Sequence, residues 1–205
     1  MNNKYIVLTA QVISLLYSPF YLPVFAFLAV FAFSYLNTFP WQAKALITVI
    51  VYLFTVLLPR LGIKLYRRSN GWTRHQLSAR HRRVVPYFIC ILHYSLLLLL
   101  LDHYHMPQFT RSIIIGALAI QIVCAAINAW MKISTHAAAA GGVIGALLAF
   151  SMIFNFDPTG WLCLTVLMAG AVCTSRMILR QHTLHEIWLG VVVGLICGWT
   201  AVIVN

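Results

Sequence analysis

The segment from Ser175 to Glu186 carries the side chains best suited to chemistry. Glu186 is the only glutamate of the chain and follows His182 by four residues, a spacing that on a helix places both side chains on one face. A carboxylate in that position accepts the proton of one imidazole nitrogen and leaves the other nitrogen free as a nucleophile. Arg176 and Arg180 add positive charge that suits an anion such as phosphate. The segment therefore predicts nucleophilic attack on a phosphoryl group.

A second polar cluster, from Lys132 to His136, directly precedes the small-residue run 137–142. Lys132 supplies another cation, and His136 supplies a ring that can protonate a leaving oxygen. Ionisable groups at helix ends are costly in a very apolar chain, which makes both clusters candidates for function. A nucleophile, an orienting acid, a second histidine and a cationic clamp are the parts that metal-free phosphoryl transfer needs.

The segment 175–186 resembles the signature Ser-Arg-x5-His-x3-Asp of the type 2 phosphatidic acid phosphatase family, which is related to the vanadium haloperoxidases. Ser175, Arg176 and His182 match this signature at the right spacing. Glu186 stands where Asp is usual. The resemblance covers roughly the last 75 residues of the chain.

The cluster 132–136 is similar to the family motif Pro-Ser-Gly-His. Ser134 and His136 match, whereas Ile133 and Thr135 replace Pro and Gly. The two motifs come in the family order, and each precedes an apolar segment.

The resemblance implies an all-α membrane phosphatase that works through a phosphohistidine, without a metal or an organic cofactor. His182 would attack phosphorus, Glu186 would orient it, and His136 would protonate the leaving group. The implied substrate is a lipid that carries a phosphate monoester or a terminal pyrophosphate. The phosphate oxygens would be held by Lys132, Ser134, Ser175, Arg176 and Arg180.

The sequence contains no exact match to a third motif of the family, Lys-x6-Arg-Pro. Gln121, Asn128 and Lys132 share one face of an expected helix over 110–131. We expect Lys132, helped by Asn128, to replace the missing lysine. The other candidate is the segment 82–86, Arg-Arg-Val-Val-Pro, although a pair of expected helices separates it from the cluster 132–136.

The composition indicates what positions these clusters. Hydrophobic residues make up 62% of the 205 residues and charged residues only 8%, far below the roughly 25% charged residues of soluble domains. A soluble domain cannot hide so much apolar side chain, whereas lipid can surround it. We therefore expect one membrane domain over 1–205, an all-α polytopic bundle of about six or seven transmembrane helices.

Seven apolar segments are separated by turn signals such as Asn37–Pro40, Met106–Pro107 and Asn155–Gly160. The first lies near 20–37, and Pro19 and Pro23 set it off from an interfacial helix over 4–18. Glycines of the fifth and seventh segments predict close helix packing in lipid. The remaining segments are 42–60, 84–101, 110–131, 136–154, 158–175 and 184–204.

Charge orients the bundle. Eight of the fourteen Lys and Arg residues lie between 60 and 83, so the positive-inside bias predicts a cytoplasmic loop there. Counting crossings puts both polar clusters on that side and Asp102 and Asp157 on the other. The linker-free bundle favours a bacterial inner membrane, although many members of the family act on the outer face. Nucleic-acid binding is disfavoured because no folded reader is visible among the basic residues.

Three alternatives remain open at this stage. His182, His185 and Glu186 have a spacing that can bind zinc, although the neighbouring arginines oppose a cation. A transporter would place polar residues near the middle of the membrane, whereas here they gather at helix ends. A catalytically inactive relative that acts as a scaffold would also fit the degenerate motifs. The five cysteines all lie in apolar segments and predict buried side chains without disulfides.

Overall fold

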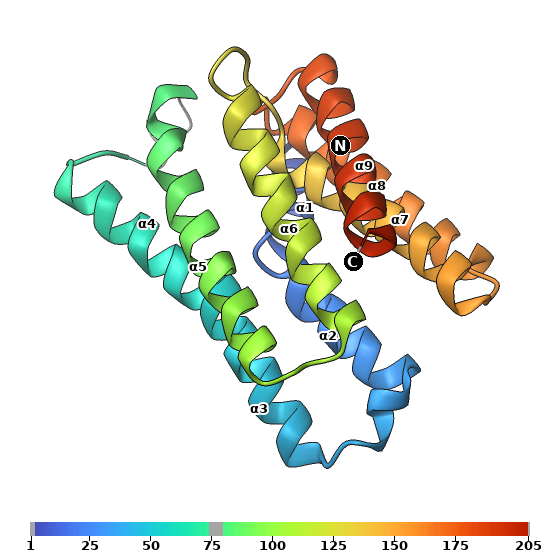
Figure 1. The fold of residues 1–205 in the computed structure, drawn as a ribbon. Helices are drawn as coiled ribbons and strands as arrows, with labels where there is room; N and C mark the ends of the chain where they lie inside the picture. The colour runs from blue at the N-terminus through green and yellow to red at the C-terminus, as the bar shows by residue number, and fades with distance from the viewer. Residues whose placement is uncertain (1–2, 74–79, 205) are drawn as a thin grey trace.

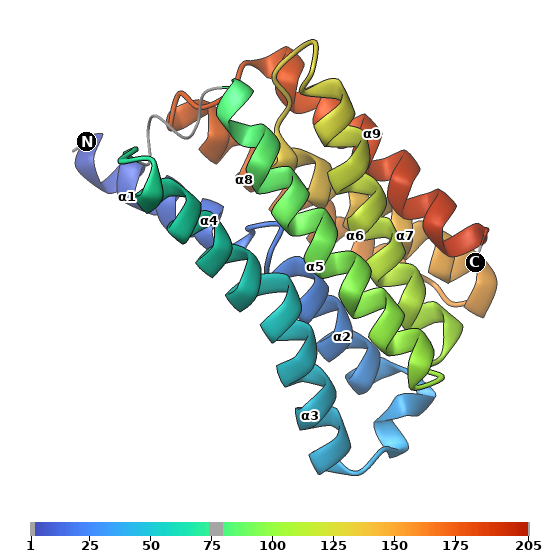
Figure 2. The same cartoon turned by 60° about the vertical axis from the view of Figure 1, so that its left-hand side comes forward.

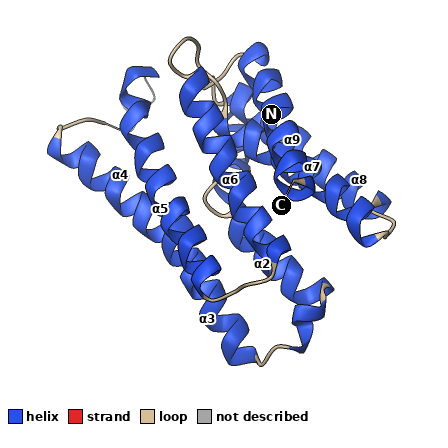
Figure 3. Ribbon diagram, in the orientation of Figure 1, coloured by secondary structure: helices blue, strands red, loops and turns tan. Residues whose placement is uncertain are grey.

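The computed structural model describes residues 3–73 and 80–204, and within these ranges every regular element is a helix (Figures 1 and 3). Six helices are long and apolar enough to cross a membrane. The predicted all-α polytopic bundle is therefore confirmed. The six helices are the continuous helix Trp41–Ser69, the helix Arg80–His103, α6 (Gln108–Ile127), α7 (Thr135–Phe154), α8 (Thr159–Ile178) and α9 (Leu184–Ile203).

The expected first span over 20–37 is wrong. The helix expected over 4–18 is present as α1 (Asn3–Leu16), whereas the segment 20–37 forms only the short helix α2 (Leu22–Phe33) and a 3-10 turn (Tyr35–Thr38). With 14 and 12 residues, α1 and α2 are each shorter than the roughly 20 residues that cross a bilayer. The expected break between them is present at residues 17–21, where Pro19 cannot donate a helical hydrogen bond. Two contacts hold this turn: Arg60 donates to the Tyr21 hydroxyl at 2.6 Å, and the Tyr94 hydroxyl donates to the Pro19 carbonyl at 3.4 Å.

The segment expected as a basic loop over 60–83 is helical in its first half. The helix that begins as α3 (Trp41–Tyr52) continues through a π-helical turn (Leu53–Leu57) into α4 (Leu58–Ser69). Pro59, in the first turn of α4, has no N–H to donate, which accounts for the π-turn before it. Arg74 of the basic segment lies outside the described residues. A 3-10 turn (Arg80–Arg83) then leads directly into α5 (Val84–His103).

The fourth predicted helix ends earlier than expected. Helix α6 ends at Ile127, so Lys132 lies in the connection to α7 and shares no helix face with Gln121 and Asn128. The Asn128 amide donates to the Arg80 carbonyl at 2.9 Å and ties the end of α6 to the 3-10 turn. Asn128 therefore positions the basic turn and does not assist Lys132, contrary to the expectation.

Helices α7 and α9 cross at backbone contact, which confirms the expected close packing (Figure 1). A Cβ atom at Gly194 of α9 would lie within 3.0 Å of backbone atoms of Ala138 and Gly142 in α7. A Cβ atom at Gly145 of α7 would lie equally close to the backbone of Leu195. Because neither backbone can move aside without separating the helices, these glycines fix the distance between the N-termini of α7 and α9.

We expect Gly194→Ala to lower the melting temperature in detergent, because the added methyl group forces the two helices apart. Overpacking of this kind costs on the order of 1–3 kcal/mol. Gly170→Ala is the matched control, since a Cβ atom at Gly170 of α8 meets no atom within 4 Å. Equal melting temperatures for the two variants would contradict the proposed role of the helix crossing.

Candidate functional site

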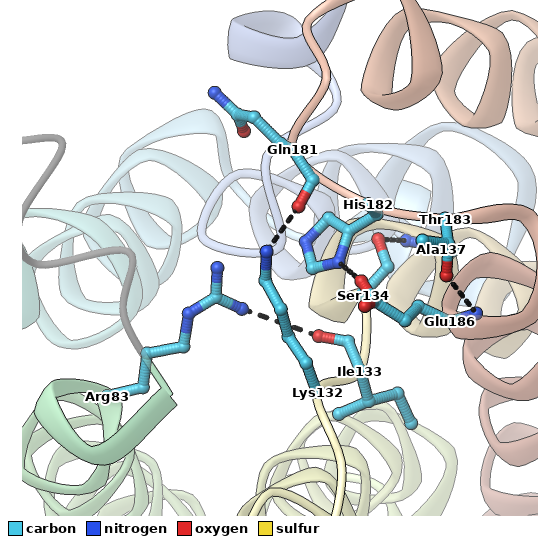
Figure 4. Close-up of polar contacts among 9 residues, drawn as sticks. All are labelled: Arg83, Lys132, Ile133, Ser134, Ala137, Gln181, His182, Thr183 and Glu186. Carbon is cyan, nitrogen blue, oxygen red and sulfur yellow. Dashed lines mark hydrogen bonds and ion pairs between the residues drawn. The ribbon is translucent and has the colours of Figure 1, made fainter.

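The two polar clusters predicted from the sequence meet at one end of the bundle, where α7 and α9 begin (Figure 4). The Ser134 amide donates to the Glu186 carbonyl at 3.3 Å. The Lys132 ammonium donates to the Gln181 carbonyl at 2.6 Å. Ile133 between them is fully buried in a core cluster that also includes residues of α5, α6, α7 and α9. The connection 128–134 is therefore held against the start of α9 by both its polar and its apolar side chains.

His182 and Glu186 form the pair expected from their spacing. Thr183 is the N-cap of α9, and its hydroxyl accepts from the Glu186 amide at 3.4 Å. A Thr-x-x-Glu sequence can form a capping box, in which the glutamate side chain returns to the N-cap amide. Here the Glu186 carboxylate is instead 2.6 Å from Nδ1 of His182, whose side chain is almost fully buried. This contact fixes the orientation of the ring.

The charge state of His182 follows from its surroundings. Burial lowers the pKa of His182 below its ordinary value of 6.5, and the positive charges of Arg83, Arg176 and Lys132 lower it further. The imidazole is therefore neutral at neutral pH, and its Nδ1–H donates to Glu186. The second ring nitrogen keeps its lone pair and lies on the side of the ring toward the Lys132 ammonium (Figure 4). This is the arrangement that a nucleophilic histidine requires.

Arg83 also lies at this site, although neither of the two sequence motifs includes it. It is the last residue of the 3-10 turn Arg80–Arg83, and its guanidinium donates to the Ile133 carbonyl at 3.5 Å. Its charge acts on both His182 and Glu186. The sequence did point to this arginine indirectly, because the segment 82–86 was the second candidate to replace the motif Lys-x6-Arg-Pro. The structure brings Arg83 and Lys132 to the same site, so neither candidate excludes the other.

Lys132 is partly buried beside these cations. Burial lowers the pKa of its ammonium below the ordinary value of 10.5, with a further contribution from Arg83. Its hydrogen bond goes to a carbonyl and not to a carboxylate. The ammonium therefore remains available to an incoming anion.

Arg176 is buried near the end of α8 and reaches the N-terminal helix. Its Nη1 donates to the Ser14 hydroxyl of α1 at 2.8 Å. Its Nε is buried and has no hydrogen-bond partner among the described residues. A buried N–H group without an acceptor is unfavourable. An anion at this edge of the guanidinium would supply the missing acceptor.

His136 occupies the first turn of α7 and is partly buried. Its ring forms a hydrogen bond with the backbone of Ser14. It also interacts electrostatically with His182, so the two histidines share one environment. With one ring nitrogen held, the other is available for proton transfer.

The remaining predicted residues differ in their placement. Ser134 is fully buried and is the N-cap of α7, accepting from the Ala137 amide at 3.4 Å. The Ser175 hydroxyl donates to the Ala171 carbonyl at 2.7 Å, so this proton forms a hydrogen bond within α8 and does not point to the site. Arg180 is exposed in the turn after α8 and has a left-handed backbone, φ 51°. The cations that act on His182 are Arg83, Arg176 and Lys132, so Arg180 is not part of that group.

An apolar cavity of about 560 Å³ lies among α2, α6 and α7. Along α7 it extends from Ala139, one turn after His136, to Phe154 at the far end of the helix. The rise from Ala139 to Phe154 corresponds to roughly 22 Å of helix. The turn between α1 and α2 contributes Pro19 at the end nearer the site, and Gln121, which the sequence placed beside Lys132, lines the wall.

No family model matches the chain, and neither the curated proteins nor the solved structures contain a detectable match.

Proposed function

We propose that the protein is a membrane phosphatase that removes a phosphate monoester, or the terminal phosphate of a pyrophosphate, from a lipid. The observation that carries this proposal is the buried pair of His182 and Glu186, with a ring nitrogen 2.6 Å from the carboxylate, beside three cations. An oriented neutral imidazole is a nucleophile, and Arg83, Lys132 and Arg176 provide positive charge for a phosphoryl group. The resemblance of segments 132–136 and 175–186 to the phosphatase motifs supports the same assignment.

In the first step, the free ring nitrogen of His182 attacks phosphorus. A bond from nitrogen to phosphorus forms as the bond from phosphorus to the lipid oxygen breaks, and His136 gives a proton to that oxygen. Glu186 accepts the Nδ1 proton in a hydrogen bond that stabilises the positive charge developing on the ring. In the second step, water attacks the phosphohistidine, His136 takes a proton from this water, and inorganic phosphate leaves.

The apolar cavity supports a lipid as the substrate. It begins one helical turn from His136 and is lined mainly by apolar side chains. Its volume of about 560 Å³ falls within the roughly 300–1,000 Å³ of small-molecule sites. A phosphate at the helix ends would therefore place the attached hydrocarbon chain at the mouth of the cavity. By the positive-inside bias, we place the site on the cytoplasmic side of a bacterial inner membrane.

Purified protein in detergent should release inorganic phosphate from one or more members of a panel of lipid phosphates and pyrophosphates. His182→Ala should lower the rate by at least a hundredfold, because the nucleophile is lost. Glu186→Gln should slow turnover and keep substrate binding, because the amide still occupies the space but no longer stabilises the charged ring. Vanadate, which mimics the trigonal bipyramidal phosphorus, should inhibit the wild-type protein.

His185→Ala is the matched control, since His185 lies exposed in the first turn of α9, three residues after His182. A wild-type rate in His182→Ala would exclude the proposed nucleophile. No release from any substrate by folded wild-type protein would exclude the phosphatase and favour the scaffold alternative.

The pH dependence tests the role of Lys132. Because the pKa of its ammonium is lowered, Lys132 keeps its charge at neutral pH and loses it as pH rises toward 10.5. The rate should therefore fall on the alkaline side before pH 10.5 is reached. Lys132→Arg should move this fall to higher pH, because a guanidinium keeps its proton throughout that range. An unchanged alkaline limb in the arginine variant would show that another group controls it.

Filling the cavity should change the preference for tail length. Ala146, on α7, lines the cavity midway between Ala139 and Phe154. Ala146→Phe should lower kcat/KM for long-chain lipid phosphates by tenfold or more and leave short-chain phosphates nearly unaffected, since the new ring blocks only the distal part. Val166→Phe on the exposed face of α8 is the control. An equal loss for all chain lengths would contradict tail binding in this cavity.

A further inference from the structure

The N-terminal helix α1 contacts the bundle through a narrow face. Along α1 only Ala10 and Ser14 are buried, whereas large apolar side chains such as Tyr5, Leu8 and Leu15 are exposed. The helix packs on α8, and in Figure 2 its N-terminal end extends beyond the other helices. Because Ser14 is the only buried polar side chain among the described residues of α1, its partners indicate what this helix contributes.

Ser14 contacts two residues of the candidate site at once. Its hydroxyl accepts from Nη1 of Arg176 at 2.8 Å, across 162 positions of the chain. Its backbone forms a hydrogen bond with the ring of His136. One residue of α1 therefore touches both the buried cation of α8 and the histidine at the start of α7.

The contact with Arg176 determines where the rest of that guanidinium points. The group is planar and rigid, so fixing Nη1 also fixes the edge that carries Nε. This Nε is buried and has no acceptor in the described part of the chain. Arginine binds phosphate best through two parallel N–H groups on one edge. Ser14 thus holds the Arg176 guanidinium so that the edge carrying Nε can donate hydrogen bonds to an anion.

We propose that Ser14 is a positioning residue for phosphate binding, and that α1 is a functional part of the site rather than a membrane anchor alone. This inference rests on the proposed phosphatase function. Ser14 touches neither the phosphate nor the reacting atoms. It acts by holding the Arg176 guanidinium and by limiting the rotation of the His136 ring.

The test compares Ser14→Ala, Ser14→Thr and Ser18→Ala in the full-length protein, with the lipid phosphate that the wild type hydrolyses best. Ser18 is the matched control because it is a buried serine in the turn after α1, one helical turn further along the chain. We expect Ser14→Ala to lower kcat/KM about tenfold to a hundredfold, as for a lost hydrogen bond to a charged group. The vanadate concentration needed for inhibition should rise with it. Ser14→Thr keeps the hydroxyl and should recover most of the activity, and Ser18→Ala should match the wild type.

Melting temperatures separate positioning from folding. A drop in activity of Ser14→Ala that follows a lower melting temperature, with KM and vanadate inhibition unchanged for the folded protein, would assign a structural role and overturn the inference. Wild-type activity and vanadate inhibition in Ser14→Ala would also overturn it while leaving the phosphatase intact. Absence of phosphate release by the wild-type protein would instead exclude the function itself, and this inference with it.

Discussion

The crossing of α7 and α9 is the constraint on which the site depends. Because Gly194 has no side chain, its backbone can lie against that of Ala138. A Cβ atom at Gly190, one turn nearer the site, would be 2.7 Å from the Ser134 carbonyl. The same contact therefore sets the distance between the two helix starts, one of which carries His136 and the other Glu186. In lipid, where apolar burial does little to hold helices together, such close backbone packing is a main source of precision.

The second constraint is electrostatic. Arg83, Lys132 and Arg176 act on His182, whereas the only carboxylate that the structure places beside this group is that of Glu186. Like charges that are brought together and partly withdrawn from water repel each other, so the group is unfavourable for folding by itself. A dianion such as phosphate would offset this repulsion and would also satisfy the buried Nε of Arg176. Regions that remain unfavourable in the absence of a ligand are often binding sites.

The sequence predicted those parts of the structure that depend on local pattern. The helices after residue 84 follow from apolar length and turn residues, and the contact of His182 with Glu186 follows from the period of one helix. Ser14 could not be predicted, because its contact with Arg176 spans 162 positions and its local sequence is an ordinary apolar helix. Arg83 was obscured by the surrounding basic residues, whose charge indicates orientation in the membrane but not contact with one carbonyl.

The boundaries that were mispredicted have related causes. The expected break at Pro19 is present, because α1 ends at Leu16, just before this proline. The helix that begins at Trp41 instead continues through Pro59 to Ser69, beyond its expected end near residue 60. A proline removes one hydrogen bond in either case, and the packing of neighbouring helices decides whether the helix resumes on the same axis. The end of α6 at Ile127 was similarly set by tertiary contact, because the Asn128 side chain binds the Arg80 carbonyl.

The relation of the cavity to the polar site argues against a transport pathway. A transporter needs polar groups along a route that can open alternately to both sides. Here the charged groups lie at one end of the helices, and the cavity that begins beside them is lined mainly by apolar side chains down to Phe154. Such a cavity offers no hydration to an ion or a polar solute over about 22 Å of helix. It matches instead a molecule whose charged group stays at the membrane surface while its hydrocarbon chain extends inward, so that the depth of the tail would set the position of the phosphate relative to His182.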